Sequence, residues 1–422
     1  MRGFLFISSF LVAVVLVSSS CTGPRSIAGR NISYLYNPAP LVKVDVDYIV
    51  LNKNDSRSTI FWRADKRTLQ NAEDDQGNTT YSFVFRYRLF PSYSAPEPLD
   101  SGKVIFKELE DSLETYLLDS LEISTTYGRN YLLEITLKDL NSRRENKSFV
   151  TITKSNPFTR QSFLLLDREN HLVFEPFVVE PDTYLLRTAE PRQALFAKFY
   201  NREFPIASPP FSMVAPKPFD FTPDKMIGMV KSQNKFILPI TTTGLYQIAT
   251  DEEKKTGGAV YYFGTFYPQA KMVMDLAMPL RFITTNEEYT QMMEEEGLKK
   301  SVDKYWLSVG GNPNRARELI RSYYQRVEIA NTLFASYIEG WKTDRGMCYL
   351  VFGPPNVVNR STATETWLYG EEGKYNSLSL TFTKVVNPFT PNDYRLNRSA
   401  TLKTPWYRAV EFWRQGRVLT YK

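Results

Sequence analysis

Hydrophobic and polar residues alternate with a period of two along much of the first 275 residues. Residues 42–50, 81–89 and 133–137 each place apolar side chains on one side and polar ones on the other, and residues 149–152 add one more such strand. This alternation is typical of antiparallel sheets that have one face in solvent. We therefore predict a β-sandwich over residues 38–154.

A second strand-rich stretch follows a linker at residues 155–157, and it is predicted to form another sandwich over residues 158–275. Its middle, residues 204–223, contains six prolines and is expected to be an extended loop, because proline cannot donate to a sheet ladder. Short strands punctuated by turns favour an immunoglobulin-like build for both sandwiches. The strands are expected at residues 162–166, 171–175, 194–200, 235–240, 244–248 and 259–266.

The period changes to that of a helix from about residue 284. Thr285 and Glu288 fit a capping box that opens one helix, and Asn312 with Pro313 fits the start of a second, longer one. Gly340 is expected to end the long helix in a left-handed conformation.

Strands and one more helix are expected after Gly340. The strands are predicted at residues 347–352, 365–369, 378–382 and 417–421, and a helix begins at Thr404 and Pro405. Five of the six tryptophans lie from Trp306 onward, which indicates a separate core. The predicted fold is thus multidomain and mainly β, with two immunoglobulin-like sandwiches followed by an α+β module over residues 284–422.

The first 21 residues have the pattern of an export signal. Residues 4–17 are apolar, which is too short for the roughly 20 residues that span a bilayer, and small residues lead into Cys21. The run before Cys21 resembles a lipobox, which implies a signal peptide at residues 1–20 and acyl chains on Cys21. Residues 21–37 are then expected to be a lipidated tether. The alternative is an ordinary signal peptide followed by a chance cysteine.

Composition narrows the function classes. The net charge of +6 is spread along the chain without a basic block, so a nucleic-acid role is unsupported. With Cys21 lipidated, Cys348 is the one remaining thiol and is expected to be an inert core residue.

The sequence Gly340-Trp341-Lys342-Thr343-Asp344-Arg345-Gly346 resembles the signature of the GWxTD domain, which is found in envelope lipoproteins of Bacteroidetes-type bacteria. The following residues are similar as well: Gly353, Pro354, Pro355, Glu365 and Trp367. The resemblance implies an envelope location and an architecture, because the family has no assigned reaction.

Turn chemistry explains most of this signature. Trp341 can pack back on the preceding helix, Thr343 and Asp344 can accept hydrogen bonds from nearby backbone N–H groups, and Gly346 permits a tight entry into a strand. Gly353, Pro354 and Pro355 are expected to force the exit from that strand. Arg345 and Asp344 could meet Glu365 or Arg360 in a polar cluster. The alternative is that this cluster forms a ligand or partner surface.

Enzyme motifs are largely missing from the sequence. The single histidine, His171, lies in a charged turn, and neither a nucleophile elbow, a phosphate-binding loop nor zinc-ligand spacing is found. We therefore predict no catalytic residues, no cofactor and no metal. A hydrolase that uses paired carboxylates stays open and would need a deep pocket with clustered carboxylates near Asp344. Glu294, Glu295 and Glu296 are interpreted as a solvated helix end.

The leading hypothesis is a non-catalytic scaffold in the cell envelope that is anchored in the outer membrane through the lipid on Cys21. The sandwiches would hold the C-terminal module away from the membrane, and this module would contact a protein partner, as in outer-membrane assembly or export. Residues 22–25 lack the acidic cluster associated with surface export, which favours the periplasmic face. The alternative is glycan or peptide binding, with exposed aromatic residues such as Tyr87 or Tyr93 stacking on sugars.

Overall fold

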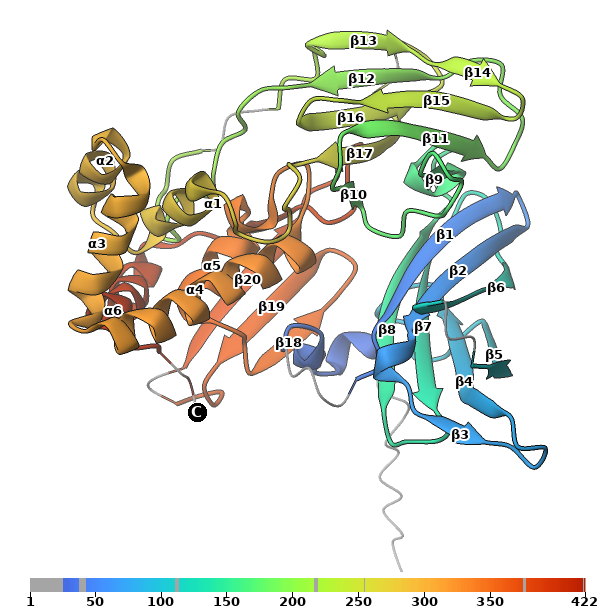
Figure 1. The fold of residues 1–422 in the computed structure, drawn as a ribbon, viewed down its shortest axis with the longest axis horizontal. Coiled ribbons are helices and arrows are strands. Elements are labelled where there is room, and N and C mark those ends of the chain that lie inside the picture. The colour runs from blue at the N-terminus through green and yellow to red at the C-terminus, as the bar shows by residue number, and fades with distance from the viewer. Residues whose placement is uncertain are drawn as a thin grey trace, which may run out of the picture.

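The computed structural model describes residues 26–37, 43–110, 114–215, 219–253, 255–374 and 377–419, together with residue 421. Two β-sandwiches are followed by a module of helices and one sheet, as Figure 1 shows. The mainly β, multidomain fold class is therefore confirmed. Cys21 and the apolar run before it lie outside the described residues.

The first sandwich places a three-stranded sheet against a five-stranded one. The order is β1-β2-β6 in the first sheet, and β4 pairs with β3, β5 and β7 in the second, where β8 pairs with β7. The apolar positions of the alternating stretches face inward, and Trp62 and Phe83 lie at the centre of this core. The strands are β1 (Val46–Asn54), β2 (Arg57–Asp65), β3 (Asn71–Glu73), β4 (Thr79–Phe90), β5 (Asp100–Leu109), β6 (Tyr116–Ser124), β7 (Asn130–Asp139) and β8 (Glu145–Thr153).

The second sandwich has sheets ordered β14-β15-β11-β9 and β10-β17-β16-β12-β13. Residues 204–215 and 219–223 form the extended loop that the prolines predict. The strand expected at residues 171–175 is wrong, because only Leu172 bridges to Leu166 there. The strands are β9 (Phe163–Leu166), β10 (Phe177–Val178), β11 (Asp182–Thr188), β12 (Phe196–Tyr200), β13 (Lys225–Gly228), β14 (Val230–Ser232), β15 (Lys235–Ile240), β16 (Gly244–Ala249) and β17 (Gly258–Tyr262).

Each sandwich contains a tyrosine whose hydroxyl bonds to the backbone a few residues upstream. Tyr131 in β7 accepts from the N–H of Thr126 at 2.9 Å, and Tyr246 in β16 donates to the carbonyl of Thr242 at 2.7 Å. This corner is a hallmark of immunoglobulin-like sandwiches, where it ties the turn to the start of the next strand. The immunoglobulin-like expectation therefore has a physical basis in both units.

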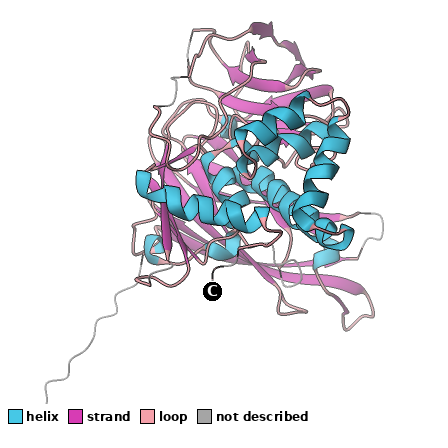
Figure 2. Ribbon diagram, turned by 90° about the vertical axis from the view of Figure 1, so that its left-hand side faces the viewer, coloured by secondary structure: helices cyan, strands magenta, loops and turns pink. Residues whose placement is uncertain are grey.

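The C-terminal module packs its helices on one face of a four-stranded antiparallel sheet (Figure 2). Trp306, Trp341, Trp367, Trp406 and Trp413 are all buried in its core, as their clustering in the sequence predicts. The elements are α1 (Val273–Ala277), α2 (Asn286–Glu294), α3 (Leu298–Gly310), α4 (Pro313–Phe334), α5 (Asp344–Phe352), β18 (Val357–Arg360), β19 (Thr364–Tyr369), β20 (Leu378–Lys384), β21 (Tyr394–Leu396) and α6 (Lys403–Arg414).

Helix starts in this module follow the predicted caps. Thr285 and Glu288 make both hydrogen bonds of the capping box, and the Asn312 side chain accepts from the N–H of Arg315 at 3.0 Å. The predicted strand at residues 347–352 is wrong, since these residues form most of α5. No strand is formed at residues 417–419, the described start of the last predicted strand.

The segment from Ser26 to Asn37 joins the first sandwich to the C-terminal module. Ile27 is buried with Phe90 and Leu132 of the first sandwich, whereas the residues from Ile32 onward pack on the module, which lies at the other end of the sequence. The N–H of Ile32 donates to the carbonyl of Val358 at 2.9 Å, and the N–H of Val358 donates to the Asn31 side chain at 3.0 Å. Ile32 and Tyr36 are buried in the module core. The helical segment that contains them lies beside β18, as Figure 1 shows. We call residues 26–37 the N-terminal strap. Residues 26–37, which the sequence assigns to the tether, are therefore packed against two folded parts of the chain. The expectation that the sandwiches hold the module away from the membrane stays a prediction.

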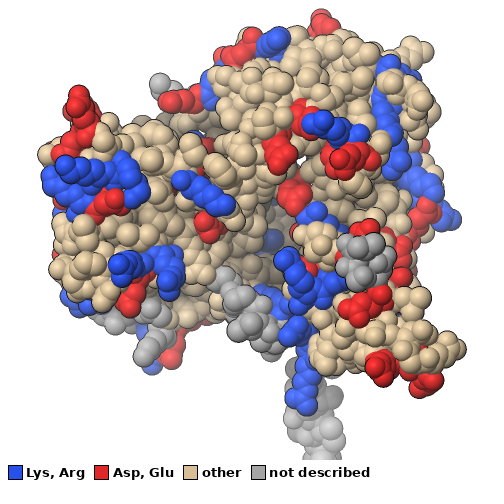
Figure 3. Space-filling model, in the orientation of Figure 1, with Lys and Arg blue, Asp and Glu red and all other residues tan. Residues whose placement is uncertain are grey.

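Charged residues of both signs are interspersed on the face drawn in Figure 3. Among the described residues, no helix is long and apolar enough to cross a membrane.

Candidate functional site

The signature residues 340–346 form a compact helix start. Gly340–Lys342 is one turn of 3-10 helix, and Thr343 is the N-cap of α5. The Thr343 hydroxyl accepts from the N–H of Gly346 at 3.1 Å and donates to the carbonyl of Gly340 at 2.8 Å. The predicted role of Thr343 as a turn residue is confirmed, but the turn leads into a helix and not into a strand.

The two signature glycines are required by close backbone packing. A β-carbon at position 340 would lie 1.9 Å from the carbonyl oxygen of Ala330 in α4, and one at position 346 would lie 1.9 Å from the carbonyl oxygen of Gly340. Gly340 does not adopt the left-handed conformation expected of it, and α4 already ends at Phe334. Glycine is thus needed here for space. A positive φ is found instead at Gly353, where φ is 85° at the end of α5 and Pro354 and Pro355 follow.

The tryptophan and aspartate of the signature are both held by distant residues. Trp341 is buried, and its backbone N–H donates to the Asn331 side chain of α4 at 3.2 Å. Asp344 accepts from both terminal nitrogens of Arg398, at 2.6 and 2.9 Å, and from the N–H of Leu396 at 2.7 Å. This bidentate pair joins the start of α5 to the residues after β21.

A second buried ion pair lies next to Asp344 in the sequence. Arg345 is 2% exposed, and its guanidinium contacts Glu365 Oε2 at 3.3 Å and the carbonyl of Asn392 at 2.9 Å. It also lies 4.1 Å from the centre of the Tyr394 ring, a cation–π contact.

Glu365 is the centre of this network and is 0% exposed. Its Oε2 also accepts from Arg360 Nε at 2.7 Å, while Oε1 accepts from the Tyr36 hydroxyl at 2.8 Å and from Trp367 Nε1 at 2.7 Å. Burial opposes ionisation of Glu365, but Arg360 and Arg345 outweigh it and lower its pKa to about 2. The predicted cluster of Arg345, Glu365 and Arg360 is confirmed, whereas Asp344 pairs with Arg398 instead.

Tyr36 links the N-terminal strap to this network, so removing its hydroxyl is expected to loosen the strap. Tyr36→Phe removes the donor to Glu365 and an acceptor for Arg360, which should lower the free energy of unfolding by about 1–2 kcal/mol. Chemical denaturation followed by tryptophan fluorescence measures the loss. Tyr34→Phe is the matched control, because no hydrogen bond of its hydroxyl is found among the described residues. Equal stability of Tyr36→Phe and wild type would contradict a structural role for the hydroxyl.

The long loop of the second sandwich also crosses the signature. The N–H of Ala207 donates to the carbonyl of Lys342 at 2.8 Å, and Arg398 donates to the carbonyl of Ser208 at 2.9 Å. The same arginine that holds Asp344 therefore holds the loop. The signature is a junction between the module and residues of two distant segments.

A cleft opens beside the signature, between the second sandwich and the module. Its volume is about 290 Å³, and Lys342 and Glu339 form a 2.7 Å ion pair at its edge. Aromatic side chains make up much of its wall, and Arg202 is paired within it to Asp220 and Asp224. The residues that line it on the module side are Met278, Tyr337, Ile338, Glu339 and Lys342, and those on the sandwich side include Tyr200, Glu203, Phe204, Tyr262 and Phe263.

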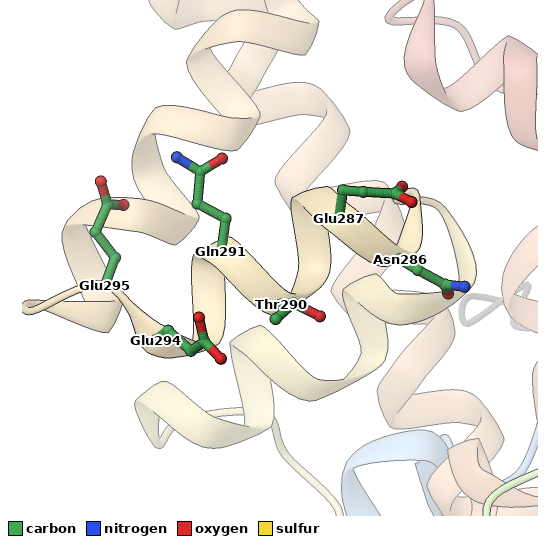
Figure 4. Close-up of a pocket in the computed structure, with 6 residues that line it drawn as sticks. All are labelled: Asn286, Glu287, Thr290, Gln291, Glu294 and Glu295. Carbon is green, nitrogen blue, oxygen red and sulfur yellow. The ribbon is translucent and has the colours of Figure 1, made fainter.

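Another hollow follows the exposed face of α2, and Figure 4 shows its six lining residues. Glu287 lies near the start of the helix and Glu294 and Glu295 at its end, and their side chains spread away from one another. Glu295 pairs with Ser301 and Lys304. This arrangement fits the solvated helix end inferred from the sequence.

Other residues considered for chemistry are placed as follows. His171 is exposed, and its Nδ1 lies 3.0 Å from Asp167 Oδ2. Cys348 is fully buried, and this burial raises the pKa of its thiol. Tyr87 and Tyr93 are half-buried and pack on neighbouring side chains, so neither presents the open ring that sugar stacking needs. In the described part of the chain, no three His, Cys, Asp or Glu residues lie close enough together to hold a metal ion.

Several residues of the site were not found from the sequence. Arg398, Asn392 and Tyr36 lie 54, 47 and 329 positions from their partners Asp344, Arg345 and Glu365. No local pattern marks such pairs.

Residues 244–415 match the model of the GWxTD domain family. The chain contains a GWxTD domain. The match begins at the first residue of β16, whereas the change of period in the sequence predicts a start at residue 284, and it ends one residue after α6. The GWxTD match thus includes two central strands of the second sandwich, which agrees with the close contact between that sandwich and the signature.

No curated protein matches the chain. Among solved structures, red sea bream transglutaminase is similar over 49% of this chain and 28% of its own, with 8% identity and a TM-score of 0.20. The BSP domain of a biofilm associated protein is similar over 55% of this chain and 53% of its own, with 9% identity and a TM-score of 0.18. The chain thus spans about a quarter and about half of the length of these two proteins. Scores this low do not establish a common fold.

Proposed function

We propose that this GWxTD protein is a non-catalytic lipoprotein that binds a protein partner at the cleft between its second sandwich and its C-terminal module. One observation carries the proposal. The polar groups of the signature are paired internally, while an aromatic cleft opens directly beside Lys342. The buried residues of the signature then shape the binding surface, and Lys342 is the signature residue that lines it.

The cleft has the features of a recognition site. Binding pockets are common at domain interfaces and combine apolar walls with a few charged groups. Aromatic side chains dominate binding energy at protein interfaces because they bury a large area with few rotatable bonds. A volume of about 290 Å³ suits one or two side chains of an extended segment. Phe204 and Tyr337 pack edge to face with their ring centres 5.2 Å apart, and we expect a peptide-like segment of the partner to bind in the cleft against this aromatic pair.

In this proposal, a lipid on Cys21 anchors the protein in the outer membrane, and the folded domains face the periplasm. The apolar run 4–17 and the small residues before Cys21 support it. Ile27 of the strap is buried in the structure and lies six residues after Cys21 in the sequence. A fully extended chain of six residues spans only about 20 Å. A lipidated chain would thus hold the junction of its first sandwich and its C-terminal module near the membrane surface.

Photocrosslinking in intact cells tests both parts of the proposal. A photoreactive residue at position 203, which is exposed and lines the cleft, is expected to give one discrete adduct with a protein of defined mass. The same residue at position 325, exposed on α4, is the control and should not give that adduct. In a second arm, Cys21→Ala is expected to release the protein from the membrane fraction. Identical adducts at both positions would contradict partner binding at the cleft. A wild type that is absent from the membrane fraction would contradict the lipid anchor.

A further inference from the structure

A basic pocket lies on the first sandwich, on the outer face of the sheet that contains β4, β5 and β7. Figure 1 shows where these three strands lie in the sandwich. The register places Arg86 between Thr136 of β7 and Lys103 of β5, and Arg88 between Glu134 and Ser101. These six side chains share the face opposite the core, because the intervening Tyr87 and Ile135 pack in the core cluster. Together with Tyr87 and Gly102 they line a hollow of about 490 Å³.

Glu134 is the acidic residue that lines this pocket, and its carboxylate already forms ion pairs with three basic side chains. Glu134 is 2% exposed, and its carboxylate contacts Arg30 of the N-terminal strap at 3.3 Å, Lys147 at 3.2 Å, and Arg88. Three positive charges therefore surround one negative charge. No further neutralising capacity remains on Glu134 for the other basic residues of the pocket.

Arg86 and Lys103 form a pair of like charges in the pocket, which is unusual between neighbouring strands. They stand directly opposite each other on neighbouring strands, and both are exposed. Like charges in this position repel and destabilise a sheet. Among the described residues, no carboxylate forms an ion pair with either of them. An anion between the two strands would remove the repulsion, and the adjacent hydroxyls of Ser101 and Thr136 could donate to it.

We propose that this pocket binds an oxyanion of the phosphate type, held by Arg86, Arg88 and Lys103. Guanidinium groups offer paired N–H donors that match the oxygens of phosphate, and lysine adds a compact charge. A lipid headgroup and a soluble phosphate ester carry the same chemistry. The proposal does not depend on the partner cleft, which lies on other elements of the chain.

Binding is tested with two probes. Inorganic phosphate is added to the full chain in detergent, and detergent-free phosphatidylglycerol vesicles are added to the Cys21→Ala chain, with phosphatidylcholine vesicles as blank. The wild type is expected to bind at least one probe saturably. The double variant Arg86→Gln/Lys103→Gln should bind at least tenfold more weakly. Binding of phosphate indicates a soluble ester as ligand, and binding of the anionic vesicles alone indicates a headgroup.

A matched control and a stability measurement make the test decisive. Lys300→Gln/Lys403→Gln removes two exposed charges of the helical module and should leave affinity unchanged. Without any anion, Arg86→Gln/Lys103→Gln is expected to melt at or above the wild-type temperature, because the like-charge pair is gone. The probe that binds should raise the Tm of the wild type and of the control, but not that of Arg86→Gln/Lys103→Gln. The proposal is overturned by a wild type that binds neither probe, or by equal weakening in the control.

Discussion

Replacing Gly340 by alanine is expected to prevent stable folding of the GWxTD module. The added methyl group would lie 1.9 Å from the Ala330 carbonyl oxygen and 2.7 Å from the α-carbon of Asn331, both in the backbone of α4. A backbone carbonyl cannot rotate away as a side chain can, so η6 (Gly340–Lys342) must move off α4. Overpacking of this kind costs about 3 kcal/mol or more. Chemical denaturation followed by tryptophan fluorescence is the measurement.

Gly228→Ala is the matched control for this substitution. Gly228 ends β13 and does not adopt a positive φ, and a methyl group added there would meet no atom within 4 Å. The same chemical change should therefore alter stability by less than about 1 kcal/mol. If both alanine variants unfold at the same denaturant concentration, close packing of Gly340 is not what the signature requires.

Replacing Glu365 by glutamine is expected to cost about 3–5 kcal/mol, because it leaves two arginines without their carboxylate in the module interior. Arg345 is 2% exposed and Arg360 has 18% of its side chain exposed, so water cannot fully replace the lost partner. Glutamine keeps the shape of the side chain, which separates the charge from the packing. Urea denaturation at pH 7 measures the difference. Glu371→Gln, which breaks an exposed 3.9 Å pair with Lys374, should change stability by less than about 0.5 kcal/mol.

The same network predicts how stability depends on pH. The pKa of Glu365 is about 2 in the folded protein and near 4.5 when unfolded, so its contribution is present above pH 4.5. That contribution is lost as the pH falls from about 4.5 to 2, and it amounts to about 3 kcal/mol. Glu365→Gln should lose less stability than wild type over this interval. Parallel acid titrations of the two proteins would contradict the low pKa.

Local chemistry made part of the fold predictable. The caps at Thr285 and Asn312 rest on hydrogen bonds within four residues, and both are formed as expected. The alternating stretches of the sandwiches have the same origin, since the register of a strand shows in its own residues. α5 was mistaken for a strand because a short apolar run fits a buried helix equally well.

The site was less accessible to this reasoning. Thr343 was identified correctly as a turn residue, because its hydroxyl acts on Gly346, three residues away. The glycine at position 340 was expected to end a helix in a left-handed conformation, but it is required because its backbone lies against Ala330 of α4. The partners of Asp344 and Glu365 come from distant parts of the chain, and only the folded structure brings Arg398 and Tyr36 to them.

The N-terminal strap also affects the order in which the molecule can be completed. A chain that is synthesised or exported from its first residue releases Ile32 and Tyr36 long before β18 and β19, their neighbours in the core, exist. The sandwiches contain their own cores and can close early, but the strap must wait for more than 300 further residues. A product that stops before Glu365 would leave Ile32 and Tyr36 of the strap unburied. The core of the GWxTD module can therefore close only after β18 and β19 have been made.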